Sequence, residues 1–357
     1  MLAAMTGVTL EQLGGWPGVL GTLTGGGDLS AEQAATAMAE ILDGNATSAQ
    51  IAGFIVALRM KGETVVELTG LVAAMVERAA PVVLARPEGV IDLVGTGGDR
   101  SHSINVSTLA ALTVVGAGGR VCKHGNRAAS SACGTADLLE ALGVAFDLGP
   151  EGVARCVDVV DFGFCFAPRF HGAMRHAGPT RKELGVPTVF NFLGPLANPA
   201  RVRRQVTGVA DPAMAERMVQ VLAANGAERA LVVYGHDGLD ELTITTTSTV
   251  HELRDGEVRT YDVDPQALGL AGGTLDDLRG GDATTNARLA HEVLGGKPGP
   301  QADIVALNAA AGLLAAGLVD DLAEGVDAAR SSLVDGKAAA ALEAVITESQ
   351  AARTAGL

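Results

Sequence analysis

The stretch VIDLVGTGGDRSHSINVSTLAALTVVGAGGRVCKHGNR, residues 90–127, determines how we interpret the whole chain. Its glycine-rich turn, Gly95 to Asp99, directly follows a short apolar run with the composition of a buried strand. Hydroxyl-bearing residues, a second apolar run and a polar cluster that begins at Lys123 come next. Glycines let a backbone approach a ligand closely, and free N–H groups at a helix start favour an anion. The pattern therefore predicts phosphate-binding segments at Gly95 and at His124, for a ligand with two phosphate-bearing ends.

The first glycine turn differs from two common nucleotide-binding motifs. A dinucleotide fingerprint needs glycine where Arg100 stands, and an acidic residue near positions 118–119, which are glycines here. A P-loop needs Gly-Lys-Ser/Thr, which does not follow the turn. Taken alone, the glycines are also compatible with a plain tight turn. The hydroxyls of Ser103, Ser107 and Thr108 favour an anion site, because one hydroxyl is enough to cap a helix.

The composition is that of a globular protein with an acidic surface. The 357 residues are 48% apolar and 19% charged, and the formal net charge is −15. Such a charge disfavours nucleic acid and anionic membranes as partners, and 3% aromatics disfavour base stacking. We see neither a signal peptide nor an apolar run of about 18 residues, so we expect a cytoplasmic protein without a membrane span. The four cysteines lack CxxC spacing, which predicts reduced thiols.

The first 80 or so residues predict a small bundle of helices. Ser30, Ser48 and Thr64 each begin a segment whose apolar residues recur at helical spacing. From Pro87 onward, β-branched runs such as 90–94, 117–122 and 230–234 alternate with helical segments. This alternation predicts an α/β domain with a mainly parallel central sheet and helices on both faces.

The predicted domains are therefore a small all-helical domain and a large α/β domain. Residues 1–85 form the small domain, to which a return segment near 177–193 belongs, because the α/β pattern is interrupted over residues 176–200, where Pro187, Pro195 and Pro199 break the chain. Residues 86–176 and 194–350 form the large domain, and we expect the tail after Glu348 to be frayed. Loops at the carboxyl ends of parallel strands can converge on one site, which we place in the cleft between the domains.

Three further polar clusters are candidate site residues. We expect Lys123 to Arg127 to form a loop after a strand, and Thr135 to cap the next helix. Asp240 and Glu241 follow another predicted strand, and their hard oxygens suit Mg²⁺ shared with substrate phosphates. An acidic surface turn is the alternative for that pair. His171 and Arg181 are each compatible with a structural role, although Arg181 could also bind a carboxylate.

Taken together and in order, these motifs resemble the anthranilate phosphoribosyltransferase family. The resemblance covers about residues 15 to 345, and the ordered set is far more specific than any one piece. The matching pieces are Gly-Thr-Gly-Gly-Asp at 95–99, Asn-x-Ser-Thr at 105–108, Lys-His-Gly-Asn-Arg at 123–127, Ala-Asp-Leu-Leu-Glu-Ala-Leu-Gly at 136–143, Arg-Lys-Glu-Leu-Gly at 181–185, Phe-Asn-Phe-Leu-Gly-Pro-Leu-Ala-Asn-Pro at 190–199 and Asp-Gly-Leu-Asp-Glu-Leu-Thr at 237–243.

The resemblance implies a reaction of tryptophan biosynthesis. The amino group of anthranilate would attack C1 of phosphoribosyl pyrophosphate (PRPP), which gives N-(5-phosphoribosyl)anthranilate and pyrophosphate. It also implies a homodimer joined through the helical domain, and two Mg²⁺ ions in each active site. Mg²⁺ and Lys123 would stabilise the departing pyrophosphate, and the neutral aryl amine needs positioning more than activation. We therefore expect no firm general base.

The resemblance also assigns roles to individual residues. Those implied to bind PRPP are Gly95, Gly98, Asp99, Ser103, Asn105, Val106, Ser107, Thr108, Lys123, His124, Gly125, Asn126, Arg127, Ala128, Ala129, Ser130, Ser131 and Thr135. Those implied to contact anthranilate are Gly95, Asn126, His171, Arg181, Gly194 and Pro195. Ser107, Asp240 and Glu241 are implied to bind the metal.

The chain departs from the family pattern at a few positions. Gly172 stands where proline is usual, Cys133 where serine is usual, and Thr135 where serine is common. A related transferase for a modified aminobenzoate therefore stays an alternative, as does a pyrimidine nucleoside phosphorylase of the same fold. A non-catalytic homologue that binds nucleic acid is an alternative of another class, which the net charge of −15 and the Asp240-Glu241 pair disfavour.

Overall fold

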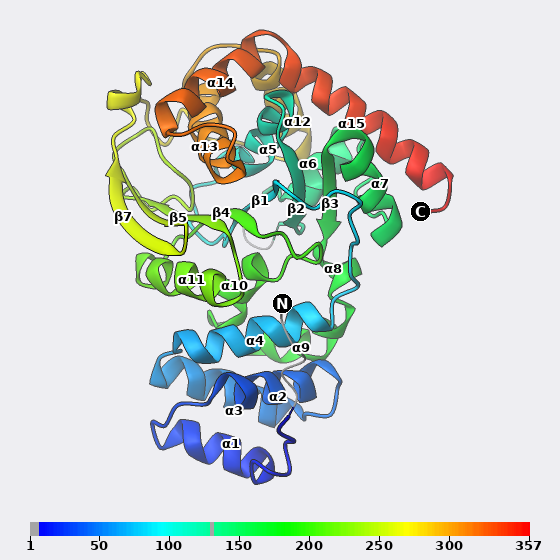
Figure 1. Ribbon diagram of the computed structural model, residues 1–357, viewed down its shortest axis with the longest axis vertical. Helices are drawn as coiled ribbons and strands as arrows, with labels where there is room; N and C mark the ends of the chain where they lie inside the picture. The colour runs from blue at the N-terminus through cyan, green and yellow to red at the C-terminus, as the bar shows by residue number, and fades with distance from the viewer. Residues whose placement is uncertain (1–6, 129–131) are drawn as a thin grey trace.

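The computed structural model describes residues 7–128 and 132–357, and a helical part lies below a larger α/β part in Figure 1. The predicted roles of Ala129, Ser130 and Ser131 lie outside the described residues. The helical part begins with α1 (Gly15–Thr24), α2 (Ala31–Leu42), α3 (Ser48–Lys61) and α4 (Val65–Glu77).

Capping boxes begin three of these four helices. The side chains of Ser30, Thr47 and Thr64 each accept a hydrogen bond from the backbone three residues later, and a Gln or Glu side chain returns one. The starts predicted at Ser30, Ser48 and Thr64 are therefore confirmed, with Thr47 as the capping residue before Ser48.

The segment after residue 176 returns to the helical part. It contains α9 (Gly178–Leu184) and α10 (Phe190–Leu193). Phe190 and Leu193 are buried in the same apolar cluster as Phe54 of α3 and Leu71 of α4. This cluster continues into α11 (Pro212–Ala224). The helical part and one face of the sheet therefore share a continuous apolar contact.

A twisted sheet forms the centre of the larger part. Its seven strands within the described residues lie in the order β3-β2-β1-β4-β5-β6-β7. The first five in that order pair in parallel, and β6 and β7 extend the edge as an antiparallel ribbon. The mainly parallel sheet is thus confirmed. The strands are β1 (Val90–Gly95), β2 (Arg120–Gly125), β3 (Phe162–Phe166), β4 (Arg204–Gly208), β5 (Arg229–Gly235), β6 (Ser248–Arg254) and β7 (Glu257–Val263).

Helices cover both faces of this sheet. The buried α13 (Pro300–Ala316) packs against β1, β4, β5 and α5 (Val106–Gly116). The longer remaining helices are α6 (Thr135–Ala141), α7 (Pro150–Val160), α12 (Ala283–Leu294), α14 (Leu322–Val334) and α15 (Lys337–Thr354). The shorter ones are α8 (Ala167–Phe170), η1 (Gly172–His176), η2 (Gly194–Leu196) and η3 (Gln266–Leu268). Among the described residues, no helix combines the length and apolarity needed to cross a membrane.

Three local predictions were wrong. The second strand does not end at Cys122 but runs from Arg120 to Gly125, because the Lys123 and His124 side chains find buried polar partners. Thr135 is the first residue of α6, whereas Gly134 precedes the helix as its cap. The tail after Glu348 is helical to Thr354, since Ala352 is fully buried in an apolar cluster.

Candidate functional site

A cleft opens at the carboxyl ends of β1, β2 and β5, where ligand sites of open α/β sheets lie. Its volume is about 500 Å³. Most predicted site residues in the described part of the chain line it, together with Asn191 from the return segment. The predicted residues that line it are Gly95, Gly98, Asp99, Ser103, Asn105, Val106, Ser107, Lys123, His124, Gly125, Asn126, Arg127, Ala128, Thr135, Asp240 and Glu241.

Two glycines allow Asp240 to lie across the strand ends. A Cβ at Gly95 would overlap the Asp240 carboxylate, and a Cβ at Gly208 would overlap the Asp240 backbone carbonyl. The carboxylate then accepts a hydrogen bond from the backbone N–H of Gly97, 2.7 Å away. The sequence predicted that the backbone at Gly95 lies close to a ligand, and the structure shows that a glycine is also needed there for the approach of Asp240. Gly208 was not identified from the sequence.

The carboxylates of this region are buried close to one another. Burial raises the pKa of Asp240 to about 7, and repulsion from Asp99 acts in the same direction. Burial and the charge of Asp240 raise the pKa of Glu241 well above its ordinary range. A divalent cation would offset this repulsion, so the donor set fits Mg²⁺. No group of three His, Cys, Asp or Glu side chains among the described residues could hold a metal, so substrate oxygens would have to complete its coordination.

Lys123 supplies a buried cation beside these carboxylates. Its side chain is held within the cleft by the Leu93 carbonyl and by the Ser107 hydroxyl, at 3.1 Å, to both of which the ammonium donates. Burial lowers the pKa of Lys123, and the charges of Asp92, Glu241 and Asp240 oppose that shift. The ammonium therefore lies in a water-poor site, where electrostatic interactions are strong.

The start of α5 presents polar side chains to the cleft, while its first backbone N–H groups are already engaged. The N–H of Val106 donates to the Ile104 carbonyl, and that of Thr108 donates to the Asn105 carbonyl. Asn105 precedes the helix, but its side chain does not cap it. Its amide instead donates to the Cys133 carbonyl and accepts from Asn286, at 3.1 and 2.9 Å. Thr108 does not line the cleft, because it is fully buried and donates to the Thr135 hydroxyl at 3.4 Å. The helix start therefore offers the cleft its polar side chains rather than free N–H groups.

Arg127 lines the cleft with its guanidinium already paired. It donates to Asp137 at 2.6 Å and to Glu140 at 2.8 Å, and it lies over the Phe146 ring. Asp137 also accepts hydrogen bonds from the backbone N–H groups of Ala128 and Gly134. The side chain of Arg127 therefore holds the chain after β2 against α6, and its charge is compensated within the protein.

We call residues 95–107, Lys123, Asp240 and Glu241 the glycine wall. On the opposite face of the strand ends, His124 contacts His171 and Gly194. We call these three residues and Arg181, which lies on α9 beside the Phe190 ring, the histidine wall. Successive side chains in a strand point to opposite faces, so Lys123 belongs to the first wall and His124 to the second. Of the histidine wall only His124 lines the main cleft, and Pro195, which follows Gly194, does not line it either.

Several buried polar atoms of this region lack a partner. Nδ1 of His124 is 3.2 Å from the Gly194 carbonyl, and the rings of His124 and His171 are 5.0 Å apart. Nε2 of each histidine is buried without a hydrogen bond, as are the hydroxyls of Thr180 and Thr188. Burial lowers the pKa of His124 to about 3 and also lowers that of His171, so both rings are neutral at pH 7. Unpaired buried polar atoms indicate a region completed by a ligand or by water.

Arg181 of α9 is a partly buried cation without an acidic partner among the described residues. Its guanidinium lies 4.9 Å from the Phe190 ring centroid, and no hydrogen bond or ion pair engages it. Burial lowers its pKa, although a guanidinium stays charged at neutral pH. This arrangement fits a planar carboxylate, which arginine binds through two parallel hydrogen bonds.

Sequence reasoning missed the buried support of the histidine wall. Asp92 of β1 is fully buried, and it accepts from the His124 backbone N–H at 3.1 Å and from the Asn198 amide at 2.8 Å. The Asn198 amide also donates to the Cys122 carbonyl. A carboxylate inside an apolar strand is rare unless paired, and this rarity could have identified Asp92. Asn191 and Asn198 could both have been found as the two polar residues of the otherwise apolar 190–199 motif.

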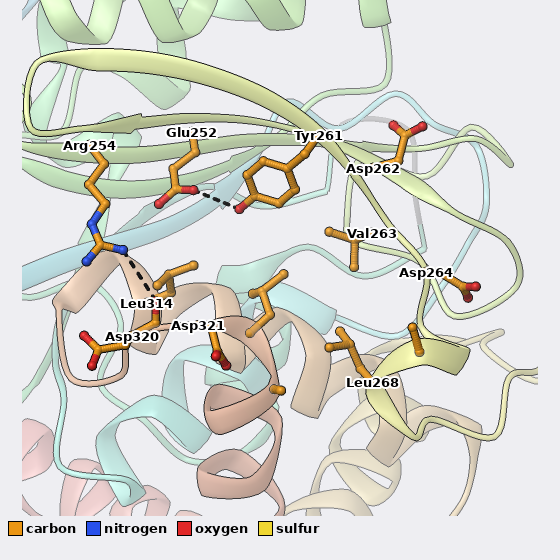
Figure 2. Close-up of a pocket in the computed structure, with 13 residues that line it drawn as sticks. Glu252, Arg254, Tyr261, Asp262, Val263, Asp264, Leu268, Leu314, Asp320 and Asp321 are labelled. Carbon is orange, nitrogen blue, oxygen red and sulfur yellow. Dashed lines mark hydrogen bonds between the residues drawn. The ribbon is translucent and has the colours of Figure 1, made fainter.

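A pocket of about 390 Å³ lies away from these strand ends, between β6, β7 and the start of α14 (Figure 2). Arg254 is its only basic lining residue, and the Tyr261 hydroxyl donates to Glu252 at 3.0 Å. Its lining carboxylates are Glu252, Asp262, Asp264, Asp320 and Asp321. Because such a lining repels anions, this pocket is a poor phosphate site.

Comparison with known proteins gives matches along nearly the whole chain. Residues 87–339 match the family described as "Glycosyl transferase family, a/b domain", and residues 17–79 match "Glycosyl transferase family, helical bundle domain". The anthranilate phosphoribosyltransferase of Rhodococcus jostii is 55% identical over 333 residues, which are 92% of this chain and 91% of that protein. The enzyme of the same name from Salinispora arenicola is 51% identical over 347 residues, 95% of this chain and 98% of its own length.

Solved structures of similar proteins share the fold. The anthranilate phosphoribosyltransferase of Thermus thermophilus superimposes with a TM-score of 0.88 at 43% identity, covering 93% of this chain and 99% of its own. The enzyme of Saccharomyces cerevisiae in complex with PRPP and Mg gives a TM-score of 0.86 at 29% identity, covering 94% and 98%. The same yeast enzyme in complex with 4-fluoroanthranilate gives 0.84 at 28% identity, with the same coverage.

Proposed function

The chain belongs to the anthranilate phosphoribosyltransferase family, and from this premise we propose how its cleft performs the reaction. The enzyme transfers the phosphoribosyl group of PRPP to the amino group of anthranilate and releases pyrophosphate, in tryptophan biosynthesis. The single observation that carries the assignment to this cleft is the presence of the glycine wall and the Asp240-Glu241 carboxylates in one cleft, since one ligand is a polyphosphate that is bound together with Mg²⁺. The unpaired Arg181, which does not line that cleft, would take the carboxylate of the aromatic ligand.

The glycine wall would bind PRPP. The backbone of the glycine turn that begins at Gly95 suits the phosphates, and Asn105 is held in place by Asn286. The Lys123 ammonium would stabilise the negative charge that develops on the departing pyrophosphate. Ser107 contributes by holding that ammonium. The roles predicted for Ala129, Ser130 and Ser131 in the same binding loop remain part of the proposal.

Asp240, Glu241 and Ser107 are the residues that we propose to hold Mg²⁺. The repulsion between the buried carboxylates supports this assignment. Mg²⁺ neutralises phosphate charge when it is bound, and two ions in each site are our proposal from the family resemblance.

The histidine wall would orient anthranilate. Arg181 would take the carboxylate, while Asn126, His171 and the turn at Gly194 and Pro195 would flank the ring. The neutral rings of His124 and His171 add no charge that would attract a second phosphate. Positioning of the amine near C1 would then supply the main contribution of this wall to the rate.

Assembly and location are further parts of the proposal. We propose a homodimer joined through the helical domain and a cytoplasmic enzyme, both from the family resemblance. The domain limits that we propose are 1–85 with 177–193 for the helical domain, and 86–176 with 194–350 for the α/β domain. The two family matches, at 17–79 and 87–339, support a boundary between Ala79 and Pro87.

A fluorescence assay tests the function directly. The purified chain should consume anthranilate only when PRPP and Mg²⁺ are both present, and a panel of substituted aminobenzoates should react more slowly. Faster turnover of a modified aminobenzoate would favour the alternative acceptor. Phosphorolysis of a pyrimidine nucleoside, or tight DNA binding without turnover, would contradict the assignment.

A further inference from the structure

A separate cavity of about 230 Å³ lies where α4 meets α11 and the segment that leads into β4. It shares no lining residue with the main cleft. Figure 1 places α4 and α11 on either side of the junction between the helical part and the α/β part. The apolar lining residues are Val72, Ala73, Val76, Leu196, Val202, Leu222 and Ala227, and the polar ones are Asn198, Arg201, Arg203, Gln205 and Asn225.

The polar part of this lining is positively charged. It contains two arginines and no carboxylate, in a chain whose formal net charge is −15. Arg203 is paired with Glu228 at 2.9 Å and donates to the Gly226 carbonyl. The guanidinium of Arg201 has no hydrogen bond or ion pair with any described residue, so its charge is available to a ligand.

Asn225, at the carboxyl end of α11, supplies a second unused polar group. Both the nitrogen and the oxygen of its side-chain amide are buried without a hydrogen-bond partner. Burial of an unpaired amide is unfavourable, and native proteins seldom tolerate it without a reason. Because no hydrogen bond holds the amide in place, it can turn toward an occupant of the cavity without losing one.

From these observations we propose that this cavity binds a small aromatic monocarboxylate. Arg201 takes the carboxylate, Asn225 adds a hydrogen bond, and the ring packs against Val72, Val76 and Leu222. Because seven of the lining residues are apolar, the cavity favours an organic acid over inorganic phosphate. The volume lies below the roughly 300–1,000 Å³ of sites for drug-sized ligands, which limits the ligand to about one ring.

Two residues that line the cavity, Gln205 and Asn198, also form hydrogen bonds with the residues that support the histidine wall. Gln205 donates to the Pro195 carbonyl at 2.6 Å, and Asn198 donates to Asp92 at 2.8 Å. An occupant therefore contacts two residues that position the proposed anthranilate side of the active site. Resting on the proposed function, we expect occupancy to change the KM for anthranilate more than kcat.

Calorimetric titration with benzoate, L-phenylalanine and inorganic phosphate tests the site. Wild-type protein should bind two benzoates per chain, because Arg181 offers one site and Arg201 the other. Arg201→Gln should bind one, and Ala73→Leu, which fills the apolar part, should do the same. Arg259→Gln, at an exposed arginine outside the cavity, should still bind two. L-Phenylalanine distinguishes an amino-acid ligand from a benzoate-like one.

Two results would overturn the site. One is the absence of Arg201-dependent binding for both carboxylates, and the other is phosphate binding as tight as that of benzoate. Failure of the active-site proposal is distinguishable, because it would instead remove the Arg181-dependent binding. For the coupling, benzoate also competes with anthranilate at the Arg181 site, so saturating benzoate should change the KM for anthranilate in both chains, and this change should differ about fivefold between wild type and Arg201→Gln. An equal benzoate-dependent change of KM in the two chains would overturn the coupling.

Discussion

The glycine wall lines the main cleft, whereas the histidine wall reaches it only through His124, and the two walls are built in different ways. The glycine wall consists of short contiguous segments whose backbone N–H groups and glycines are close in sequence. The histidine wall combines residues of β2, α9 and η2 with His171, which precedes η1, and the buried contacts of Asp92 and Asn198 hold the His124 backbone. In our proposal, the first wall binds charge through local geometry, whereas the second positions an aromatic ring through packing between distant segments.

The largest expected effect comes from the carboxylates of the glycine wall. Asp240→Asn combined with Glu241→Gln should lower kcat at least about 100-fold at any Mg²⁺ concentration, because the negative charges that would hold the ion are removed. Rates measured against a Mg²⁺ series check this. Asp255→Asn, at a side chain that is 86% exposed, is the control. Full activity of the double variant would refute the metal role.

A substitution of Arg181 tests whether the two walls bind different substrates. Arg181→Ala should raise the KM for anthranilate about tenfold or more, since a charge-assisted pair is lost, and should leave the KM for PRPP nearly unchanged. Lys182→Ala, an exposed cation on the same helix, is the matched control. Equal increases in both KM values would argue against a carboxylate contact.

Asn198 tests the buried support of the histidine wall. Asn198→Ala leaves one oxygen of the buried Asp92 carboxylate and the Cys122 carbonyl without a donor, so the free energy of unfolding should fall by about 1–3 kcal/mol. Urea unfolding measures this loss.

A double-mutant cycle separates that contact from other effects of the substitution. The double variant Asn198→Ala with Asp92→Ala should lose less free energy of unfolding than the sum of the losses in the two single variants, because the unpaired carboxylate is then absent. Strict additivity would show that the two side chains do not act together.

The burial of His124 predicts how stability depends on pH. Its pKa is about 3 in the folded chain and about 6.5 in the unfolded chain, so only the unfolded chain takes up this proton as the pH falls below 6.5. The stability present above pH 6.5 is therefore lost with acidification. Between pH 7 and pH 5, wild type should lose about 2 kcal/mol more than His124→Asn. Urea midpoints at both pH values measure it, and equal losses would contradict the assignment.

The smallest effect is expected at the departure from the family pattern. Gly172 begins a 3₁₀-helix, and an added Cβ would meet only the end of the Arg175 side chain, at 3.8 Å. Gly172→Pro should therefore stabilise the chain by about 0.4–1 kcal/mol without changing acceptor preference. Thermal unfolding and competition between aminobenzoates measure both. A shift in preference would show that this turn selects the acceptor.

The same contrast explains what could be predicted from sequence. The turn at Gly95, the alternation of strands and helices and the Asp240-Glu241 pair are local patterns, and the structure brings them together at one cleft. The strand through Lys123 and His124 was missed because two adjacent ionisable residues disfavour a buried strand. Their partners, Leu93, Ser107 and Gly194, lie 16 or more residues away in the chain. Asp92 and Asn198 were missed for the same reason, since 106 residues separate them.

The close approach of Asp240 to two strand ends also limits how the protein can be changed. Gly95 and Gly208 each occupy a position where even a methyl group would collide with Asp240, at Gly208 with its main chain. A directed-evolution library aimed at new acceptors gains nothing from varying either position, because every substitution displaces a proposed metal-binding loop. Diversity is better concentrated around Arg181, where we propose that the carboxylate of the aromatic substrate binds.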